Sequence, residues 1–412
     1  MSDRYFDNFM LKYVEEKASV PGIEEEQDDN EDSLLKLLKM PYPTLCEKLK
    51  RTALDLKETI VVETWGYTGQ KVQDFTIYTG TLGTAFLLLK SYQVTNNKND
   101  LDLCSEIIKA CDSASSGSSV VSFLSGRAGV CALGAVVAKH QGNKQMVDYY
   151  LSQFKEIKVT EDGPVELIRG RTGYLWACLF LNKNFGDGTI PSTHTSPVVD
   201  KIIENGREMG VASRCPLMFE YSGDIYWGAA HGLAGIMYVL MHFGLPPDAL
   251  ADVNKTLKYM INNRFPSGNY PRDEARRSDE LVYWCHGAPG VALTLIKAAE
   301  VFEDKEFLEA AIDASKVVWS RGLLKKVGIC HGISGNAYVF LSLYRMTGNV
   351  EFLHKAKAFA CFLLDRAHKL ISEGQMHGGD TPYSFFEGIR GMAYLFLDMT
   401  DPANAKFPAH EL

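Results

Sequence analysis

The chain has no uninterrupted apolar run of the roughly 20 residues that a membrane-spanning helix needs. A typical apolar stretch, from Val130 to Ala138, has nine residues and lies between Arg127 and Lys139. Similar stretches recur along the chain, and we interpret them as buried helices of a core. We therefore expect no transmembrane span, whereas peripheral attachment to the plasma membrane stays open.

Basic side chains are not in excess either. The 412 residues include 43 basic and 51 acidic side chains, which gives a formal charge of −8. A nucleic-acid binder needs a basic face to meet the phosphates, so we expect no nucleic-acid partner. The hydrophobic fraction of 46% is ordinary for a folded protein and excludes a mostly disordered chain.

Signs of secretion are also missing. Residues Met1 to Tyr5 lack the apolar core of a signal peptide. The nine cysteines are odd in number and widely scattered, unlike the cysteines of a disulfide framework. These features predict a cytoplasmic protein with reduced cysteines.

Glycine, by contrast, is abundant, with 35 residues. Fourteen of them form a Gly-x-x-Gly motif that recurs about every 50 residues, each time followed by an apolar, helix-forming run. The seven motifs begin at Gly80, Gly126, Gly170, Gly232, Gly287, Gly332 and Gly388. Seven copies at a regular period indicate an internal repeat.

Each repeat has room for two helices of different character. Phe307, Ala311, Ala314 and Val318 follow helical spacing, with charged residues between them, and predict a half-exposed helix. Residues 331–344 contain no Lys, Arg, Asp or Glu and predict a helix that is enclosed on all sides. The pattern predicts an all-α fold, an α/α toroid of seven inner and seven outer helices. An open solenoid is the competing fold, but it would expose its inner helices.

Two regions follow from this division. We predict a single toroid domain over residues 41–412 and an N-terminal arm over residues 1–40. Within the arm, residues 24–32 carry seven acidic side chains and predict a solvated, mobile segment.

Metal-binding residue types gather in repeats four to six. A histidine directly precedes the first glycine at His231, His286 and His331, and Cys285 and Cys330 precede the last two of these histidines. Thiolate and imidazole are preferred ligands of zinc, and a catalytic zinc has three protein ligands and an open fourth position. All five residues are candidates. Adjacent residues rarely both bind one ion, so one member of each Cys-His pair can instead support the ligands. A metal-free Cys-His nucleophile is the chemical alternative.

Two thiolate ligands would make zinc a weak Lewis acid that suits activation of an incoming thiol better than hydrolysis. Addition of that thiol across a double bond then needs a proton donor. His231 is placed for this role by its position in the repeat.

Longer motifs resemble the lanthionine synthetase C-like (LanC-like) family, particularly its eukaryotic branch. The matching segments, in order, are Glu166–Leu175, Gly228–Gly235, Phe265–Pro271, Trp284–Gly290, Leu323–Lys326 before Cys330-His331-Gly332, Phe386–Gly391 and Phe407–Leu412. The resemblance implies the same toroid of seven inner and seven outer helices. It also implies Zn²⁺ ligands at Cys285, Cys330 and His331.

The resemblance further implies a reaction. Bacterial members add cysteine thiols to dehydrated Ser or Thr residues, whereas eukaryotic members resemble glutathione transferases that modify dehydroalanine or dehydrobutyrine. His231 matches the active-site histidine of the family, Glu166 lies near its active-site acid, and His286 lines the site. The expected function is therefore zinc-dependent addition of glutathione to a dehydrated phosphopeptide or protein.

The glutathione contacts match less completely. Arg4 and Lys326 resemble glutathione-contacting positions, but the loop before Cys330 is one residue shorter, so Lys325 is an equal candidate. The loop His377-Gly378-Gly379-Asp380 lacks an arginine that animal members carry. The alternative function is a non-catalytic signalling protein that binds glutathione or another small ligand and associates peripherally with a membrane or a G protein.

Overall fold

The computed structural model describes residues 3–10, 13, 32–211, 214–276 and 278–412. Within these ranges the chain is helical, and β-structure is limited to isolated bridges. Of the acidic segment at 24–32, only Asp32 belongs to the described residues, where it caps the first helix with its side chain. The predicted mobility of the rest lies outside them.

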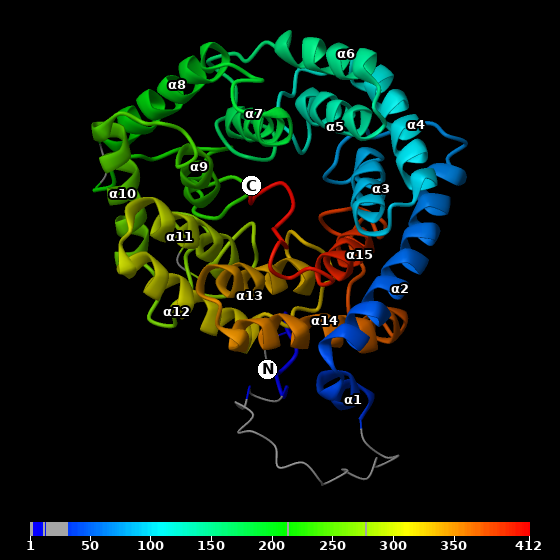
Figure 1. Ribbon diagram of the computed structural model, residues 1–412. Coiled ribbons are helices and arrows are strands. Elements are labelled where there is room, and N and C mark those ends of the chain that lie inside the picture. Colours follow the sequence, from blue (N-terminus) through cyan, green and yellow to red (C-terminus); the bar gives the residue numbers. More distant parts are fainter. Residues whose placement is uncertain (1–2, 11–12, 14–31, 212–213, 277) are drawn as a thin grey trace.

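The helices form two concentric rings (Figure 1). The outer ring consists of α2 (Tyr42–Val61), α4 (Lys98–Ser115), α6 (Lys144–Lys155), α8 (Ser192–Gly210), α10 (Pro247–Asn262), α12 (Lys305–Arg321) and α14 (Val350–Ser372). The inner ring consists of α3 (Leu82–Thr95), α5 (Arg127–His140), α7 (Arg171–Phe185), α9 (Leu233–Leu240), α11 (Ala288–Phe302), α13 (Ile333–Thr347) and α15 (Ile389–Asp398). A short α1 (Ser33–Lys39) precedes the rings, and a π-helical turn η1 (Val62–Gly66) extends α2. The predicted toroid is confirmed.

The two helix types differ in burial as their sequences predict. Helix α13 is buried continuously from Ile333 to Leu343, because inner helices are surrounded by outer helices and by one another. Helix α12 buries the predicted stripe, including Phe307 and Val318, and exposes Lys316. An open solenoid would instead leave one face of each inner helix in solvent.

Each Gly-x-x-Gly motif lies at the start of an inner helix. Glycine is needed there because the backbone is too crowded for a side chain. A Cβ atom on Gly129 would lie 1.9 Å from the carbonyl oxygen of Phe123, and one on Gly335 would lie 1.8 Å from that of Ile329. Gly287 also has a φ of 110°, which side-chain-bearing residues rarely adopt. The glycines thus allow the loop before each inner helix to fold tightly against the first turn of the helix.

These loops are joined into a closed ring of hydrogen bonds. In each repeat a donor reaches a carbonyl oxygen of the next repeat, and the last repeat returns to the first. The donor–acceptor pairs are Ile77 N to Leu124 O, Ser122 Oγ to Ile168 O, Leu167 N to Ala230 O, Ala229 N to Trp284 O, Cys285 N to Cys330 O, Cys330 N to Phe386 O and Phe386 N to Tyr78 O. Residues at the same position of neighbouring repeats therefore lie side by side.

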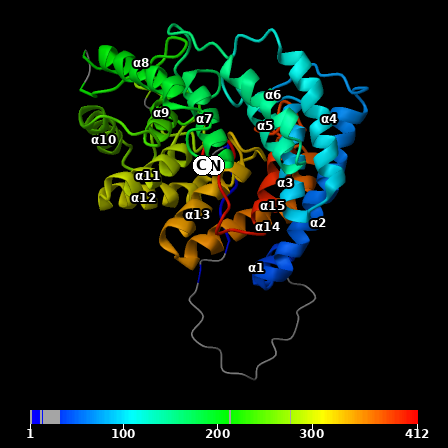
Figure 2. The same ribbon diagram turned by 45° about the horizontal axis from the view of Figure 1, so that its top comes forward.

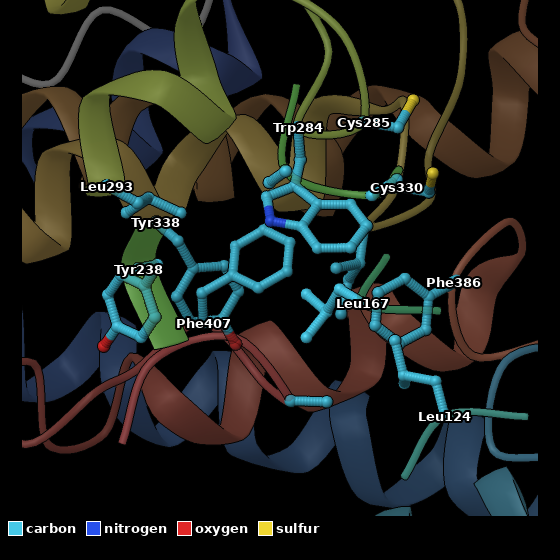
Figure 3. Packing of buried hydrophobic residues seen from close by; sticks show 14 of the residues in the cluster. Leu124, Leu167, Tyr238, Trp284, Cys285, Leu293, Cys330, Tyr338, Phe386 and Phe407 are labelled. Carbon is cyan, nitrogen blue, oxygen red and sulfur yellow. The ribbon is translucent and has the colours of Figure 1, made fainter. Parts of the chain in front are cut away.

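The C-terminal segment, residues 401–412, enters the middle of the inner ring (Figure 1). Phe407 stacks on Trp284 with ring centroids 5.1 Å apart, as the close view of the core shows (Figure 3). Trp176 donates from Nε1 to the carbonyl oxygen of His410 at 2.9 Å. The aromatic contacts fill the space that a ring of seven helices leaves along its axis. Among the described helices, none has both the length and the apolar character to traverse a bilayer.

The described parts of the arm pack against the toroid. Tyr5 forms an antiparallel bridge with Leu324, and Lys325 N donates to Arg4 O at 2.9 Å. Helix α1 contacts α14 from outside the outer ring (Figure 2). The domain boundary near residue 40 stays a prediction.

Candidate active site

Cys285 and Cys330 occupy the same position, two residues before the first glycine, in adjacent repeats. The hydrogen bond from Cys285 N to Cys330 O, at 3.3 Å, holds their backbones together. Figure 3 shows the two side chains near each other. Both side chains are buried, with exposed fractions of 8% and 2%. The repeat therefore brings together two thiols that are 45 residues apart in sequence.

His331 completes a set of three metal-binding groups. One ligand atom from each of Cys285, Cys330 and His331 lies within 4.8 Å of the other two. Two sulfurs and one ring nitrogen at this spacing fit a catalytic zinc site, in which a fourth position serves water or substrate. His286 and His231, the other two candidates, are not part of this set.

The close spacing of the three groups shifts the pKa of each. Burial raises the pKa of Cys330, but a hydrogen bond with Cys285 and the charge of His331 outweigh it and hold the pKa well below its ordinary value. The hydrogen bond with Cys330, together with burial, raises the pKa of Cys285. Burial lowers the pKa of His331, but the neighbouring Cys330 raises it more, so the net pKa is above its ordinary value. Cys330 thus carries negative charge, whereas a bound zinc would displace a proton from Cys285 and from His331.

His231 and Glu166 form a second pair at the same end of the toroid. His231 Nδ1 lies 2.9 Å from Glu166 Oε2, and the exposed fractions of the two side chains are 25% and 1%. The carboxylate also accepts hydrogen bonds from the backbone N–H groups of Ile168 and Arg169, both at 2.7 Å. These bonds fix Glu166, which then fixes the imidazole. When Nδ1 carries the hydrogen of this pair, Nε2 is left for substrate.

Two tyrosines, which the sequence did not suggest, surround His231. The Tyr221 ring stacks on the imidazole with centroids 4.8 Å apart and planes 7° apart. The centroid of the Tyr226 ring lies 5.9 Å from that of His231 and 5.4 Å from that of His286, so this ring contacts both histidines. Burial lowers the pKa of His286 to about 4, and its buried Nδ1 has no hydrogen-bond partner among the described residues.

Of the three candidate glutathione contacts, Lys326 is close enough to the metal-binding set to influence the pKa of Cys285 and of His331. Arg4 pairs with Glu280 at 3.2 Å, and hydrogen bonding with Tyr283 raises the pKa of the guanidinium. Lys325 pairs with Asp3 at 3.4 Å, whereas Lys326 has no ion pair among the described residues. Lys326 also forms a parallel bridge with His377. The arm, the loop before Cys330 and the loop at 377–380 thus meet at one edge of the site.

Glu387 is a further residue that sequence reasoning missed. It occupies the position before the first glycine of repeat seven, where repeats four to six have histidines. Burial raises the pKa of Glu387, and the nearby charge of His331 opposes this rise. Alignment of all seven motifs would have identified it. No comparable signal exists for Tyr221 and Tyr226, which lie outside the motifs.

Three comparisons with known proteins agree with this geometry. The family model described as "Lanthionine synthetase C-like protein" matches residues 71–412. The chain is 45% identical over 389 residues to LanC-like protein GCL1 of Arabidopsis thaliana, with 89% of each chain covered. It is 37% identical over 374 residues to Glutathione S-transferase LANCL1 of Danio rerio, with 87% of this chain and 90% of that protein covered.

The fold also matches a solved structure. Nisin cyclase superposes with a TM-score of 0.66 at 17% sequence identity, and the match covers 87% of this chain and 96% of nisin cyclase. At this identity the match supports the toroid fold alone.

Proposed function

The chain belongs to the lanthionine synthetase C-like family, and from this premise we propose that it adds the thiol of glutathione to dehydroalanine or dehydrobutyrine residues. The substrate is a peptide or protein in which a phosphorylated Ser or Thr has been dehydrated. The name of the similar Danio rerio protein, a glutathione S-transferase, supports the thiol donor. The observation that carries the proposal is the Cys285–Cys330–His331 set beside the His231–Glu166 pair.

Cys285, Cys330 and His331 are the residues that would hold one zinc ion. When bound, zinc would keep the sulfur of glutathione in its nucleophilic thiolate form at neutral pH. The chain itself must supply a buried, closely spaced donor set, and the 4.8 Å limit on the separations of the ligand atoms supports this role. Burial also keeps bulk water away from both cysteines.

His231 is the proposed proton donor. Sulfur attacks the β-carbon of the dehydroamino acid, a C–S bond forms, and the electrons of the double bond move toward the α-carbon and its carbonyl. A proton must then reach the α-carbon. The hydrogen bond with Glu166 occupies Nδ1 of His231, so the imidazolium form can deliver that proton from Nε2, and the proton lost by the glutathione thiol restores this form. His286 lines the site through its contact with Tyr226.

The cationic edge of the site is proposed to bind the carboxylates of glutathione. Lys326 has the strongest case because its ammonium group has no ion pair among the described residues and lies close enough to influence the pKa of Cys285 and His331. Arg4 and Lys325 already have acidic partners. To bind glutathione, each of these two side chains must therefore exchange its acidic partner for a carboxylate of glutathione.

An addition assay tests the proposal. Purified protein is incubated with glutathione and a dehydrobutyrine peptide, and mass spectrometry follows the glutathione adduct. We expect about one zinc per chain and adduct formation that depends on glutathione and is lost after treatment with a chelator. Saturable glutathione binding without any adduct would contradict the enzyme and favour the signalling alternative.

A further inference from the structure

The residue before the first glycine has a special place in every repeat. These seven residues are polar: Thr79, Ser125, Arg169, His231, His286, His331 and Glu387. Each is at least partly exposed, although the glycine that follows it is buried in every case. The position therefore forms a polar rim around the end of the toroid where the candidate active site lies. Arg169 is the only exposed residue of this rim, the other six being half-buried, and it is the only permanent cation.

Arg169 differs from the other arginines near the site because its guanidinium group has no acidic partner among the described residues. No described residue forms an ion pair or hydrogen bond with its guanidinium group. By contrast, Arg272 lies 3.6 Å from Asp273, and Arg276 lies 3.7 Å from Asp224. An unpaired guanidinium is well suited to bind a carboxylate or phosphate with two parallel hydrogen bonds.

The backbone of Arg169 is fixed beside the proposed proton donor. Its N–H donates to Glu166 Oε1 at 2.7 Å, and Glu166 is the residue that orients His231. Burial and then Glu166 raise the pKa of Tyr221, whereas Arg169 opposes this rise, so the guanidinium acts on the ring that stacks on His231. The proposed glutathione contacts belong to the arm and to repeat six instead.

We propose that Arg169 selects the electrophilic peptide by binding an anionic side chain, a phosphate or a carboxylate, that flanks the dehydroamino acid. This inference rests on the proposed function. The α-carbon of the dehydroamino acid must approach His231, so neighbouring residues of the peptide come close to repeats three and four. A guanidinium without an acidic partner at that place favours peptides that carry an anionic side chain near the dehydroamino acid. The preferred substrate class is therefore an acidic or multiply phosphorylated peptide.

Binding and turnover are both needed to test this specificity. Three fluorescent peptides have alanine in place of the dehydroamino acid and carry phosphoserine, glutamate or glutamine two residues away. We expect wild-type protein to bind the two anionic peptides at least tenfold more tightly than the glutamine peptide, and Arg169→Ala to abolish this difference. Arg169→Lys keeps the charge and should retain part of it. The phosphoserine and glutamate arms show which anion the site prefers.

The same peptides with dehydroalanine measure turnover. Arg169→Ala should raise the KM of the anionic peptides at least tenfold, with kcat and the KM for glutathione unchanged. Arg51→Ala, which removes an exposed arginine from outer helix α2, is the control for net charge.

Three results would overturn the inference: equal affinity of wild-type protein for all three peptides, no binding of any of them, or a raised KM for glutathione in Arg169→Ala. Binding of the unreactive peptides does not require chemistry. A failure of the proposed function would therefore appear as preferential binding without adduct formation.

Discussion

His231 Nδ1 lies 2.9 Å from Glu166 Oε2, although 65 residues separate the two in sequence. His231 immediately precedes the motif of repeat four, and Glu166 lies four residues before the motif of repeat three. The hydrogen bond from Leu167 N to Ala230 O, at 3.2 Å, joins these neighbouring loops. The ring of hydrogen bonds between neighbouring loops thus sets the distance between the proposed proton donor and the carboxylate that orients it.

Replacement of His231 should separate proton transfer from metal binding. We expect His231→Gln to lower kcat by about 10²–10⁴-fold, because the α-carbon loses its proton donor. Its metal content should equal that of wild type, because His231 is not part of the ligand set. Steady-state kinetics and metal analysis on the same sample measure both. An unchanged kcat would remove His231 from this role.

Replacement of a proposed zinc ligand should remove the metal together with the activity. Cys285→Ala should lose most of the bound zinc and the activity with it, because the two remaining protein ligands are too few to hold the ion. Cys46→Ala, at a buried cysteine of α2 outside the set, is the matched control and should keep both. Metal analysis after gel filtration gives the comparison. Full activity in a zinc-free Cys285→Ala protein would exclude the proposed mechanism.

The two adjacent lysines should differ in their effect on glutathione. Lys326→Ala should raise the KM for glutathione about tenfold, as expected for loss of a hydrogen bond to a charged group. Lys325→Ala should have a smaller effect, because this lysine already pairs with Asp3. Lys109→Ala, on the exposed face of α4, controls for net charge. Equal effects of all three variants would contradict the assignment.

A side chain on a motif glycine should destabilise the toroid. Gly129→Ala should lower the free energy of unfolding by about 1–3 kcal/mol, or prevent folding, because its Cβ would lie 1.9 Å from the carbonyl oxygen of Phe123. Gly117→Ala is the control, since a Cβ there would have no atom within 4 Å other than those of its own residue and its two chain neighbours. Urea unfolding followed by circular dichroism compares the two. Equal stability of both variants would show that the close approach is not needed.

Two histidines, the buried His410 and the half-buried His242, should make stability depend on pH. Burial lowers the pKa of His410 and of His242, each to about 3. In the unfolded chain a histidine takes up a proton near pH 6.5, so the unfolded state binds more protons as the pH falls from there toward 3. Stability is therefore fully present above about pH 6.5 and is lost below it, by up to about 1.4 kcal/mol per pH unit for each histidine.

Unfolding measured between pH 7 and pH 5 tests this dependence. The difference between wild type and His410→Gln isolates the contribution of this histidine from any loss of metal. We expect a shallower slope in the variant. Identical slopes would show that protonation of His410 is not linked to unfolding in this range.

Much of the fold and part of the site followed from the sequence because they depend on local rules that repeat. Seven glycine motifs, alternating with half-apolar helices, specify two rings of helices. In a closed ring, equivalent positions of neighbouring repeats are neighbours in space. The repeat could therefore group five candidates, whereas the narrower set of Cys285, Cys330 and His331 followed from the family resemblance. The separations of the ligand atoms agree with this set.

Other features depend on contacts between segments that do not occupy equivalent positions in the repeat. Tyr221 and Tyr226 lie in a loop between α8 and α9, and only its path places them against His231. The arm reaches the site because Tyr5 pairs with Leu324. These contacts depend on how irregular loops pack over the finished toroid. The sequence by itself determined the helices, their repeat and the candidate ligands, whereas tertiary structure decided the neighbours of those ligands. The physical reason is that helix periodicity is a local property, while loop packing depends on the whole closed ring.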